Sequence, residues 1–384
     1  MSNLFRVPVN NATQTLIFML LYCGSCIFGG IMLNRLKTLK ENMLVMGLDG
    51  LVVTDRADIF YLSGLESSNC LILISEKDIL LTDSRYILAA RCAQECFELR
   101  EINSSLEKEA GAIIRELGLK RVGVQDMSLS LAAYMEVSQG VQGEFLPVGE
   151  MLKKQRALKS KNELEAIKRA QAVTDFSFNK LLDYLRPGIS EKDIACELEY
   201  IMRRNGADGL AFETIAAAGE NGAKPHAQPG GCIIKSGAFL TLDFGAKKEG
   251  YCSDMTRTVA LGEPGKELRK LYQIVLDAHN RAKERLKPGA DTKDIDYSAR
   301  GYIEAQGYGK YFGHGLGHGV GIEIHELPVL SYRRQSVLEP GNVVTIEPGI
   351  YVPGLGGVRI ENMCFITESG YEDITRSDNN LIIL

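Results

Sequence analysis

Two acidic residues shortly after the midpoint of the sequence have a spacing that could bind a cation. Asp243 and Asp254 lie in strand-like runs that flank Lys247-Lys248-Glu249-Gly250, and a turn centred on Lys248 and Glu249 would set the two acids opposite one another. Directly opposed carboxylates lie about 5 Å apart and repel each other unless a cation neutralises them. One such pair is more often a solvated edge, and a one-residue slip would turn one acid away.

A second hairpin repeats this arrangement. The runs 343–352 and 358–366 flank a glycine-rich turn, and a turn centred on Gly354 places Glu347 opposite Glu361. Two such pairs in corresponding hairpins call for cations, because buried charges are normally paired or bound to metals. Four carboxylates carry four negative charges, which two divalent ions neutralise and one does not. The two hairpins therefore predict a centre that holds two metal ions.

Histidines supply the remaining ligand. Of the five histidines in the chain, His314, His318 and His325 lie in one glycine-rich stretch, residues 313–326. The alternating glycines favour extended backbone over a helix. One imidazole beside several carboxylates suits manganese, cobalt, iron or zinc, with manganese and cobalt slightly preferred where carboxylates dominate.

The hairpins end two similar stretches of sequence. The segment LRPGISEKDI, residues 185–194, is followed 101 residues later by LKPGADTKDI, residues 286–295. His226, three residues before a proline, is echoed by His325 in the same way. Ser190 and Asp291 or Thr292 are placed to cap the helices that follow. We infer two similar α/β halves related by a pseudo-two-fold axis.

Residues 32–155 predict a separate, smaller α/β domain before these halves. Strands are expected at 50–54, 70–75, 79–82 and 121–125, and helices at 85–98 and 106–117. An amphipathic helix pattern (Leu33, Leu36, Leu39, Leu44) precedes them. One long helical region from 156 to 185 leads into the second domain, residues 156–384.

Residues 1–31 differ from the rest of the chain. The stretch 16–33 has 18 residues without a charge, which is at the lower edge of what spans a bilayer. Three interpretations stand side by side: translation beginning at Met32, a membrane anchor that leaves the body in the cytoplasm, and a secretory signal. In each case the segment lies outside the fold.

The overall composition excludes some classes of partner. The formal net charge is −5 and the pI about 5.7, so the chain lacks the basic footprint of a nucleic-acid-binding protein. Nine scattered cysteines indicate reduced thiols in a cytosolic protein. His279 lies in an amphipathic helical pattern, residues 267–286, and is expected to be an ordinary surface or boundary residue.

The ordered set of acids and histidine resembles the pita-bread metallopeptidases, in their Xaa-Pro aminopeptidase and prolidase branch. Its members are Asp243, Asp254, His318, Glu347 and Glu361. The likeness runs from Met32 to the C-terminus and includes Arg156 through Lys159, with Glu163, at the entry to the second domain. It implies an α/β (α+β) protein with a creatinase-like N-terminal α/β domain, followed by a pseudo-two-fold pita-bread catalytic domain.

The resemblance also implies an activity and roles for residues. The five residues would hold two divalent metal ions, manganese before cobalt or zinc, and a metal-activated hydroxide would cleave the Xaa-Pro bond at the N-terminus of peptides. His226, His325 and Glu347 would be catalytic, His226, His314 and His325 would bind substrate, and Arg359 and Tyr351 would support the ligands. The Xaa-Pro bond has no amide hydrogen and a fixed φ, so it needs a dedicated site.

Several alternatives stay open. An Xaa-Pro dipeptidase, or prolidase, is the alternative to the aminopeptidase, and no residue decides between them. A non-catalytic pita-bread binding module is the remote alternative, because such a protein should lack ligands that are all present here. The expected partners are peptides with proline at the second position and a second copy of the chain, in the cytoplasm. Membrane association is expected only if residues 16–33 are an anchor.

Overall fold

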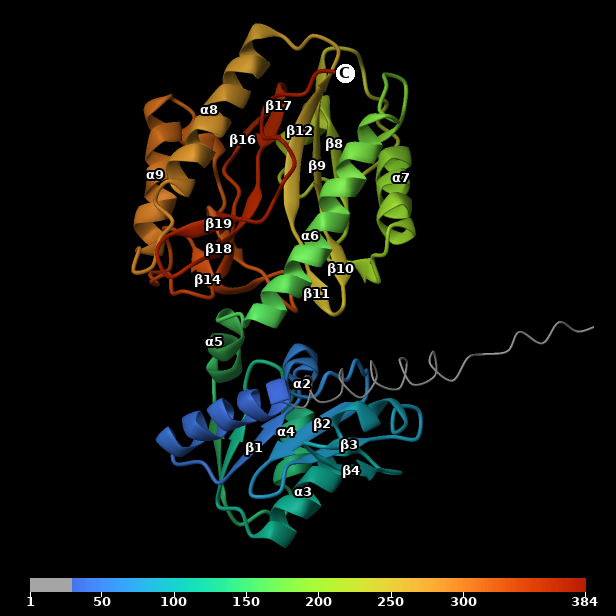
Figure 1. Cartoon of the computed structure of the whole chain (residues 1–384), viewed down its shortest axis with the longest axis vertical. Coiled ribbons are helices and arrows are strands. Elements are labelled where there is room, and N and C mark those ends of the chain that lie inside the picture. Colours follow the sequence, from blue (N-terminus) through green and yellow to red (C-terminus); the bar gives the residue numbers. More distant parts are fainter. Residues whose placement is uncertain (1–29) are drawn as a thin grey trace, which may run out of the picture. The chain divides into compact units, whose positions relative to one another are not determined.

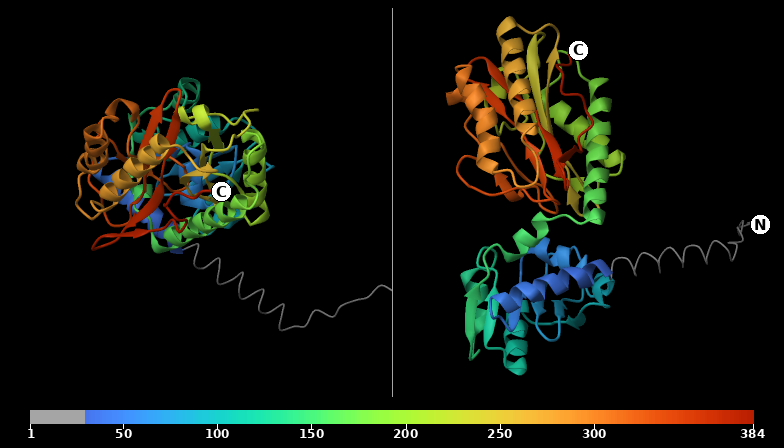
Figure 2. Two further views of the ribbon diagram at one scale, coloured as in Figure 1. Left: turned by 90° about the horizontal axis from the view of Figure 1, so that it is seen from above. Right: turned by 60° about the vertical axis from the view of Figure 1, so that its left-hand side comes forward.

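The computed structural model describes residues 30–384, which form two compact units (Figures 1 and 2). The first unit ends at Leu152 and the second comprises Lys153–Leu384. Most of the N-terminal extension, residues 1–29, lies outside the described part, so its three interpretations stay predictions. Within residues 30–384, no helix combines the length and the apolar character needed to cross a membrane.

The first unit is built on one six-stranded sheet with the strand order β4-β3-β2-β1-β5-β6. The strands are β1 (Gly50–Val53), β2 (Cys70–Ile74), β3 (Ile79–Thr82), β4 (Glu98–Glu101), β5 (Arg121–Val124) and β6 (Glu144–Pro147). The helices after residue 45 are α2 (Arg56–Ser63), α3 (Leu106–Leu117) and α4 (Leu131–Ser138). The four strands that the sequence predicts are therefore present.

Two helical predictions in this unit need correction. Residues 30–45 are helical, but the buried side chains are Met32, Leu36, Leu39 and Met43, whereas Leu33 and Leu44 are exposed. The buried four are spaced by four, three and four residues, which keeps them on one helical face. The helix expected at 85–98 is wrong: that segment forms turns and a short 3-10 helix, Ala89–Ala93. The 3-10 segment buries only Ala90 and Ala93, too little apolar surface to hold a long helix.

The second unit begins with a broken helix. The single helical region expected from 156 to 185 is two helices, α5 (Met151–Ala157) and α6 (Lys161–Leu182). Ser160 starts α6 through a capping box, in which its side chain accepts from the Glu163 backbone and Glu163 bonds back to the Ser160 backbone. Because Ser160 adopts an extended backbone, the chain turns between the two helices.

The sequence repeat is a structural repeat. Ser190 caps α7 (Glu191–Arg204), and Asp291 caps α9 (Thr292–Ala305). Before α7, Gly188 N donates to Ile234 O at 2.9 Å; before α9, Gly289 N donates to Leu338 O at 2.8 Å. The two halves therefore anchor corresponding helices by corresponding backbone contacts.

The strands of the two halves lie between two pairs of helices. Figures 1 and 2 show α8 (Lys266–Lys283) and α9 on one flank of the strands and α6 and α7 on the other. The first half contributes β8 (Ile215–Ala218), β9 (Ala238–Phe244) and β12 (Met255–Leu261), with short strands β7 (Gly209–Leu210), β10 (Ala246–Lys248) and β11 (Tyr251–Cys252). The second half contributes β13 (Gly317–Gly319), β14 (Glu326–Leu330), β15 (Val343–Ile346), β16 (Gly349–Val352), β17 (Gly356–Arg359), β18 (Asn362–Ile366) and β19 (Tyr371–Asp373).

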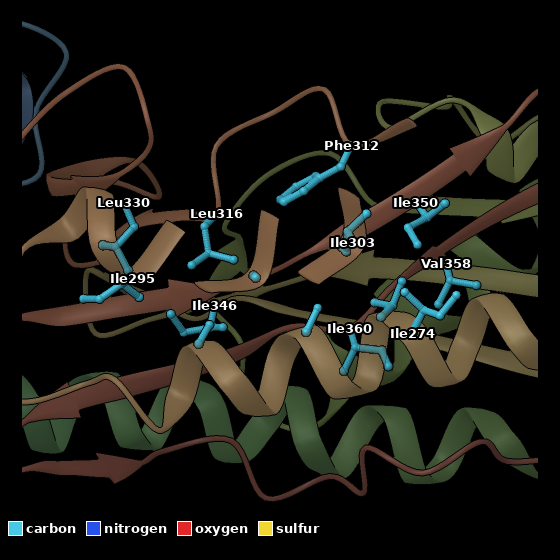
Figure 3. Close-up of a cluster of buried hydrophobic side chains, with 14 of the residues drawn as sticks. Ile274, Ile295, Ile303, Phe312, Leu316, Leu330, Ile346, Ile350, Val358 and Ile360 are labelled. Carbon is cyan, nitrogen blue, oxygen red and sulfur yellow. The ribbon is translucent and has the colours of Figure 1, made fainter. Parts of the chain in front are cut away.

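An apolar core joins the second-half strands to α8 and α9 (Figure 3). Ile274 and Ile295 from the helices are buried in the same cluster as Ile346, Val358 and Ile360 from the strand regions. Each such side chain contributes about 1.5–3 kcal/mol when fully buried. This packing holds the strands that carry the candidate ligands in place.

Candidate metal centre

The first hairpin differs in register from the prediction. Asp243 on β9 pairs with Thr256 on β12, not with Asp254. The turn is formed by Glu249 and Gly250, whose φ angles are 52° and 80°. Two-residue hairpin turns that match the strand twist need positive φ at both central residues, and this moves the centre by one residue. Asp254 directly precedes β12 and lies two residues before Thr256, so a two-residue change of register keeps the same face of the hairpin opposite Asp243.

The second hairpin keeps the predicted register. Gly349 pairs with Arg359 between β16 and β17, and Ile346 pairs with Asn362 between β15 and β18. The same register on both sides leaves Glu347 opposite Glu361 in the gap between the two paired segments. Gly354 turns the chain with a φ of 78°.

The candidate ligands converge. Asp254, His318 and Glu361 each offer a ligand atom, and these atoms all lie within 4.8 Å of one another. His318 Nε2 is 3.6 Å from Asp254 Oδ2 and 3.4 Å from Glu347 Oε1. Side chains from both halves of the repeat therefore meet at one place.

The acids of this cluster repel one another in a buried setting. Burial raises the pKa of Asp254 well above its ordinary value, and the charges of Glu361, Asp243 and Glu347 raise it further. Burial, and then the charge of Glu361, also raise the pKa of Glu347 well above its ordinary value. Burial and then Asp243 raise the pKa of Glu361 to about 8. The cluster thus favours whatever positive charge it can bind, whether protons or metal ions.

His318 presents the form that binds a metal. Its Nδ1 lies 3.0 Å from the Gly319 carbonyl oxygen and donates to it, which leaves the Nε2 lone pair toward the acids. Burial, and then the neighbouring charge of His325, lower the pKa of His318 to about 4. The ring is therefore neutral near pH 7, which is the state in which imidazole coordinates metals.

Asp243 supplies the test of fit. Its Oδ2 accepts from Arg359 Nη2 at 2.5 Å, whereas its Oδ1 is buried and has no hydrogen-bond partner among the described residues. A buried carboxylate oxygen without a donor is destabilising, and a cation would remove that cost. Four carboxylates and one neutral imidazole are a donor set for borderline divalent cations. The residues present therefore fit a metal centre.

Three further side chains hold the ligands. Arg359 donates from Nη1 to Tyr351 Oη at 2.8 Å and from Nε to Thr256 Oγ1 at 3.0 Å. Thr256 Oγ1 in turn donates to Glu361 Oε2 at 2.7 Å. Arg359 and Tyr351 are predicted from the sequence in this role, whereas Thr256 is not. Its position two residues after Asp254, on the same strand face, was the available signal.

The other predicted histidines lie around this network. His314 Nε2 accepts from Tyr351 Oη at 2.9 Å, and its Nδ1 donates to the Gly315 carbonyl at 2.7 Å. Both ring nitrogens are thus bonded within the protein. The exposed His325 packs edge-on against His318, with ring centroids 4.4 Å apart. Burial lowers the pKa of His325; Asp243 opposes this shift, and the charge of the exposed His226 adds to it.

The expectation for His279 is wrong. This residue of α8 is wholly buried, and neither ring nitrogen has a hydrogen-bond partner among the described residues. It lies four residues after the buried Val275, on the face of α8 that covers the core. Burial, and then the charges of Lys283 and Arg257, lower its pKa well below the ordinary value.

Comparisons with known proteins point to one family. The model of metallopeptidase family M24 matches residues 165–368, and that of the creatinase/prolidase N-terminal domain matches residues 35–158. An uncharacterized peptidase of Bacillus subtilis is 42% identical over 352 residues, which cover 91% of this chain and all of that one. An Xaa-Pro dipeptidase of Pyrococcus horikoshii is 34% identical over 359 residues, 92% of this chain and 99% of that one.

Solved structures agree in fold over nearly the same length. An Xaa-Pro dipeptidase from Bacillus anthracis has a TM-score of 0.89 at 38% identity, covering 92% of this chain and 100% of that one. An X-Pro aminopeptidase from Thermotoga maritima has a TM-score of 0.82 at 37% identity, covering 88% and 98%. An Xaa-Pro dipeptidase and an X-Pro aminopeptidase therefore share this architecture.

Proposed function

The chain belongs to metallopeptidase family M24, and on that premise we propose that it hydrolyses the Xaa-Pro bond of dipeptides. The relatives from Pyrococcus horikoshii and Bacillus anthracis that support this substrate are both described as Xaa-Pro dipeptidases. The aminopeptidase activity expected from the sequence is the second candidate, and the X-Pro aminopeptidase structure from Thermotoga maritima supports it. The homodimer and the cytoplasmic location implied by the resemblance stay predictions.

The observation that carries the proposal is the convergence of ligand atoms from both halves of the repeat. Asp254, His318 and Glu361 offer ligand atoms within 4.8 Å of one another, and Asp243 Oδ1 is buried without a hydrogen-bond partner among the described residues. The proposed ligands of two divalent cations are Asp243, Asp254, His318, Glu347 and Glu361. Manganese is the proposed metal, with cobalt or zinc as alternatives. When bound, such cations supply a water of lowered pKa and polarise the scissile carbonyl.

Glu347 is the proposed general base. Its Oε1 lies 3.4 Å from His318 Nε2, so a water held by the proposed cations would lie within reach of the carboxylate. Thr345 Oγ1 donates to Glu347 Oε1 at 3.3 Å, which orients the carboxylate. Glu347 would take a proton from the attacking water and pass it to the leaving proline nitrogen.

His226 and His325 are the proposed substrate contacts. Both are exposed beside the buried acids, so their rings are open to a bound peptide. His325 would donate a hydrogen bond to the carbonyl oxygen as negative charge develops there. The edge of His314 would contribute to the pocket for the proline ring through its carbon atoms, since both of its nitrogens are already bonded.

The test uses the full-length chain, stripped of metal and reloaded with manganese, cobalt or zinc. Release of proline from Ala-Pro is measured beside release of alanine from Ala-Pro-Ala, with Ala-Ala as the control for the proline requirement. Cleavage of Ala-Pro without Ala-Pro-Ala supports the dipeptidase, and turnover of Ala-Pro-Ala supports the aminopeptidase. Inactivity toward both, with every metal, would reject both peptidase proposals.

A further inference from the structure

The segment that opens the second unit buries three charged side chains outside the ligand set. They are Arg156 at the end of α5, Lys159 in the turn, and Glu163 in the first turn of α6. Arg156 is only 2% exposed. Burying a guanidinium, an ammonium and a carboxylate is costly unless each is well paired, so their partners show what this segment does.

The two cations converge on one buried carboxylate far along the chain. Arg156 donates to Glu326 Oε1 from Nη2 at 2.6 Å and from Nε at 3.2 Å. Lys159 Nζ donates to the other oxygen, Oε2, at 2.9 Å. Burial raises the pKa of Glu326, but the charges of Lys159 and Arg156 outweigh it and hold the pKa below its ordinary value. Glu326 is therefore an ionised carboxylate held on both oxygens.

Glu326 in turn folds the loop that precedes it. Its Oε1 accepts from the backbone nitrogens of Ile322 at 3.0 Å and Glu323 at 3.1 Å. A Cβ atom on Gly321 would lie 2.4 Å from Glu326 Oε2, so the carboxylate occupies the space that a side chain would need. Residues 321–326, the clamped loop, begin three residues after His318 and contain His325, which directly precedes Glu326.

Glu163 holds the neighbouring strand. Tyr251 Oη donates to Glu163 Oε1 at 3.2 Å. The next residue, Cys252, donates from its backbone nitrogen to the Gly321 carbonyl at 2.7 Å. Asp254 follows two residues after Cys252 in the chain. The clamped loop is thus bonded to the segment that leads into one of the candidate ligands.

We propose that Arg156, Lys159 and Glu163 are positioning residues that hold the clamped loop, and through it His325 and His318, in the geometry that the reaction requires. The inference rests on the proposed function for the role of His325. Arg156 and Lys159 restrain the loop through Glu326, and Glu163 restrains the strand to which it is bonded. A forked guanidinium suits this task because it contacts Glu326 Oε1 twice and reaches Glu323 Oε2 at 2.6 Å as well.

The kinetic test compares two arginine-to-lysine changes in neighbouring helices. Arg156→Lys keeps the charge but loses the forked contact. Arg169→Lys is the control, because Arg169 forms a half-exposed pair with Glu249. The Nη2 to Oε2 distance is 2.6 Å both in this pair and in the pair of Arg156 with Glu323. For manganese-loaded full-length protein on Ala-Pro, we expect Arg156→Lys to lower kcat/KM about 10–100-fold, as for side chains that orient a site. Arg169→Lys should stay within about two-fold of the unaltered protein. Glu326→Gln and Glu249→Gln form a second pair, and Arg156→Lys carries the test if Glu326→Gln does not fold.

A second readout does not depend on peptidase activity. Imidazole ¹⁵N NMR of the metal-free protein reports the five histidines, assigned by single histidine-to-asparagine changes. We expect the ring signals of His325 and His318 to shift in Arg156→Lys and to stay unchanged in Arg169→Lys. Unchanged histidine signals in Arg156→Lys, or an equal kinetic loss in Arg169→Lys, would overturn the proposal. If the unaltered chain cleaves no Xaa-Pro peptide, the proposed function fails while the NMR comparison still decides the positioning role.

Discussion

Arg359 bonds to one oxygen of Asp243, from Nη2 to Oδ2 at 2.5 Å, while the other oxygen of that carboxylate has no partner among the described residues. The guanidinium also counters the charge of the other acids: it opposes the rise in pKa that burial and Glu361 cause in Asp254 and Glu347. Arg359 therefore both orients a candidate ligand and reduces the repulsion within the cluster.

Replacing Arg359 should weaken metal binding. Arg359→Lys keeps a positive charge but cannot bond Asp243, Tyr351 and Thr256 together, so we expect manganese affinity to fall about 10–100-fold. Isothermal titration calorimetry on the stripped protein measures this. Arg269→Lys, in an exposed pair with Glu263, is the matched control. Equal affinities in the two variants would contradict the role given to Arg359.

The hydroxyl group of Thr256 should contribute more to metal binding than the volume of its side chain. Thr256→Val removes the hydrogen bond to Glu361 Oε2 and the acceptor for Arg359 Nε while keeping the shape. We expect manganese affinity to fall about ten-fold, since contacts that orient ligands are typically worth that much. Thr256→Ser, which restores the hydroxyl, should recover most of the loss. A valine variant that binds metal as tightly as the serine variant would show that the hydroxyl is dispensable.

Neutralising one acid should have opposite effects on stability and on metal binding. Asp254→Asn removes a carboxyl group whose pKa is raised by burial and by three neighbouring acids. In the metal-free protein we expect the Tm of the second unit to rise by about 2–4 °C, the shift that about 1 kcal/mol produces in a domain of this size. The rise in Tm that manganese causes should shrink in the same variant. Calorimetric scans with and without manganese check both, and a lower metal-free Tm would contradict the repulsion.

His279 should make stability fall in mild acid. Its folded-state pKa lies well below the ordinary value because burial, and then Lys283 and Arg257, disfavour the charged ring. In the unfolded chain the His279 ring takes up a proton as the pH falls through about 6.5, whereas the folded chain keeps the ring neutral. The contribution of the buried neutral ring to stability is therefore complete above about pH 6.5 and is lost as the pH falls below it. The slope is about 1.4 kcal/mol per pH unit.

The variant His279→Leu isolates this term. Because leucine does not titrate, the loss of stability between pH 7 and pH 5 should be smaller in the variant than in the unaltered chain. Urea unfolding of the metal-free protein at the two pH values measures the difference. Parallel pH profiles for the His279 variant and the unaltered chain would refute the assignment.

Much of the candidate site follows from local patterns. The second hairpin could be predicted because Gly354 supplies a positive φ at the centre of its turn, and the helix caps at Ser190 and Asp291 follow from their side chains. The first hairpin could not, because Glu249 adopts a positive φ that a non-glycine residue seldom takes. The pattern of faces survived the error, since the register moved by an even number of residues.

Long-range contacts limited the remaining predictions. Thr256 has the sequence pattern of an ordinary strand residue, and its role depends on Arg359 and Glu361, which another hairpin places beside it. His279 reads as a boundary residue because the periodicity of one helix does not show how deeply its apolar face is covered. Arg156 and Lys159 belong to the family resemblance, but the sequence does not identify their partner, because Glu326 lies more than 160 residues away.

The duplicated architecture divides the proposed metal ligands between its two halves. Asp243 and Asp254 come from the first repeat, whereas His318, Glu347 and Glu361 come from the second. With the proposed ligand set, binding of divalent ions would stabilise the packing of one repeat against the other. The proposed coordination sphere would be complete only when the two hairpins that carry the acids are packed together, which would couple the folding of the second unit to metal-dependent activity.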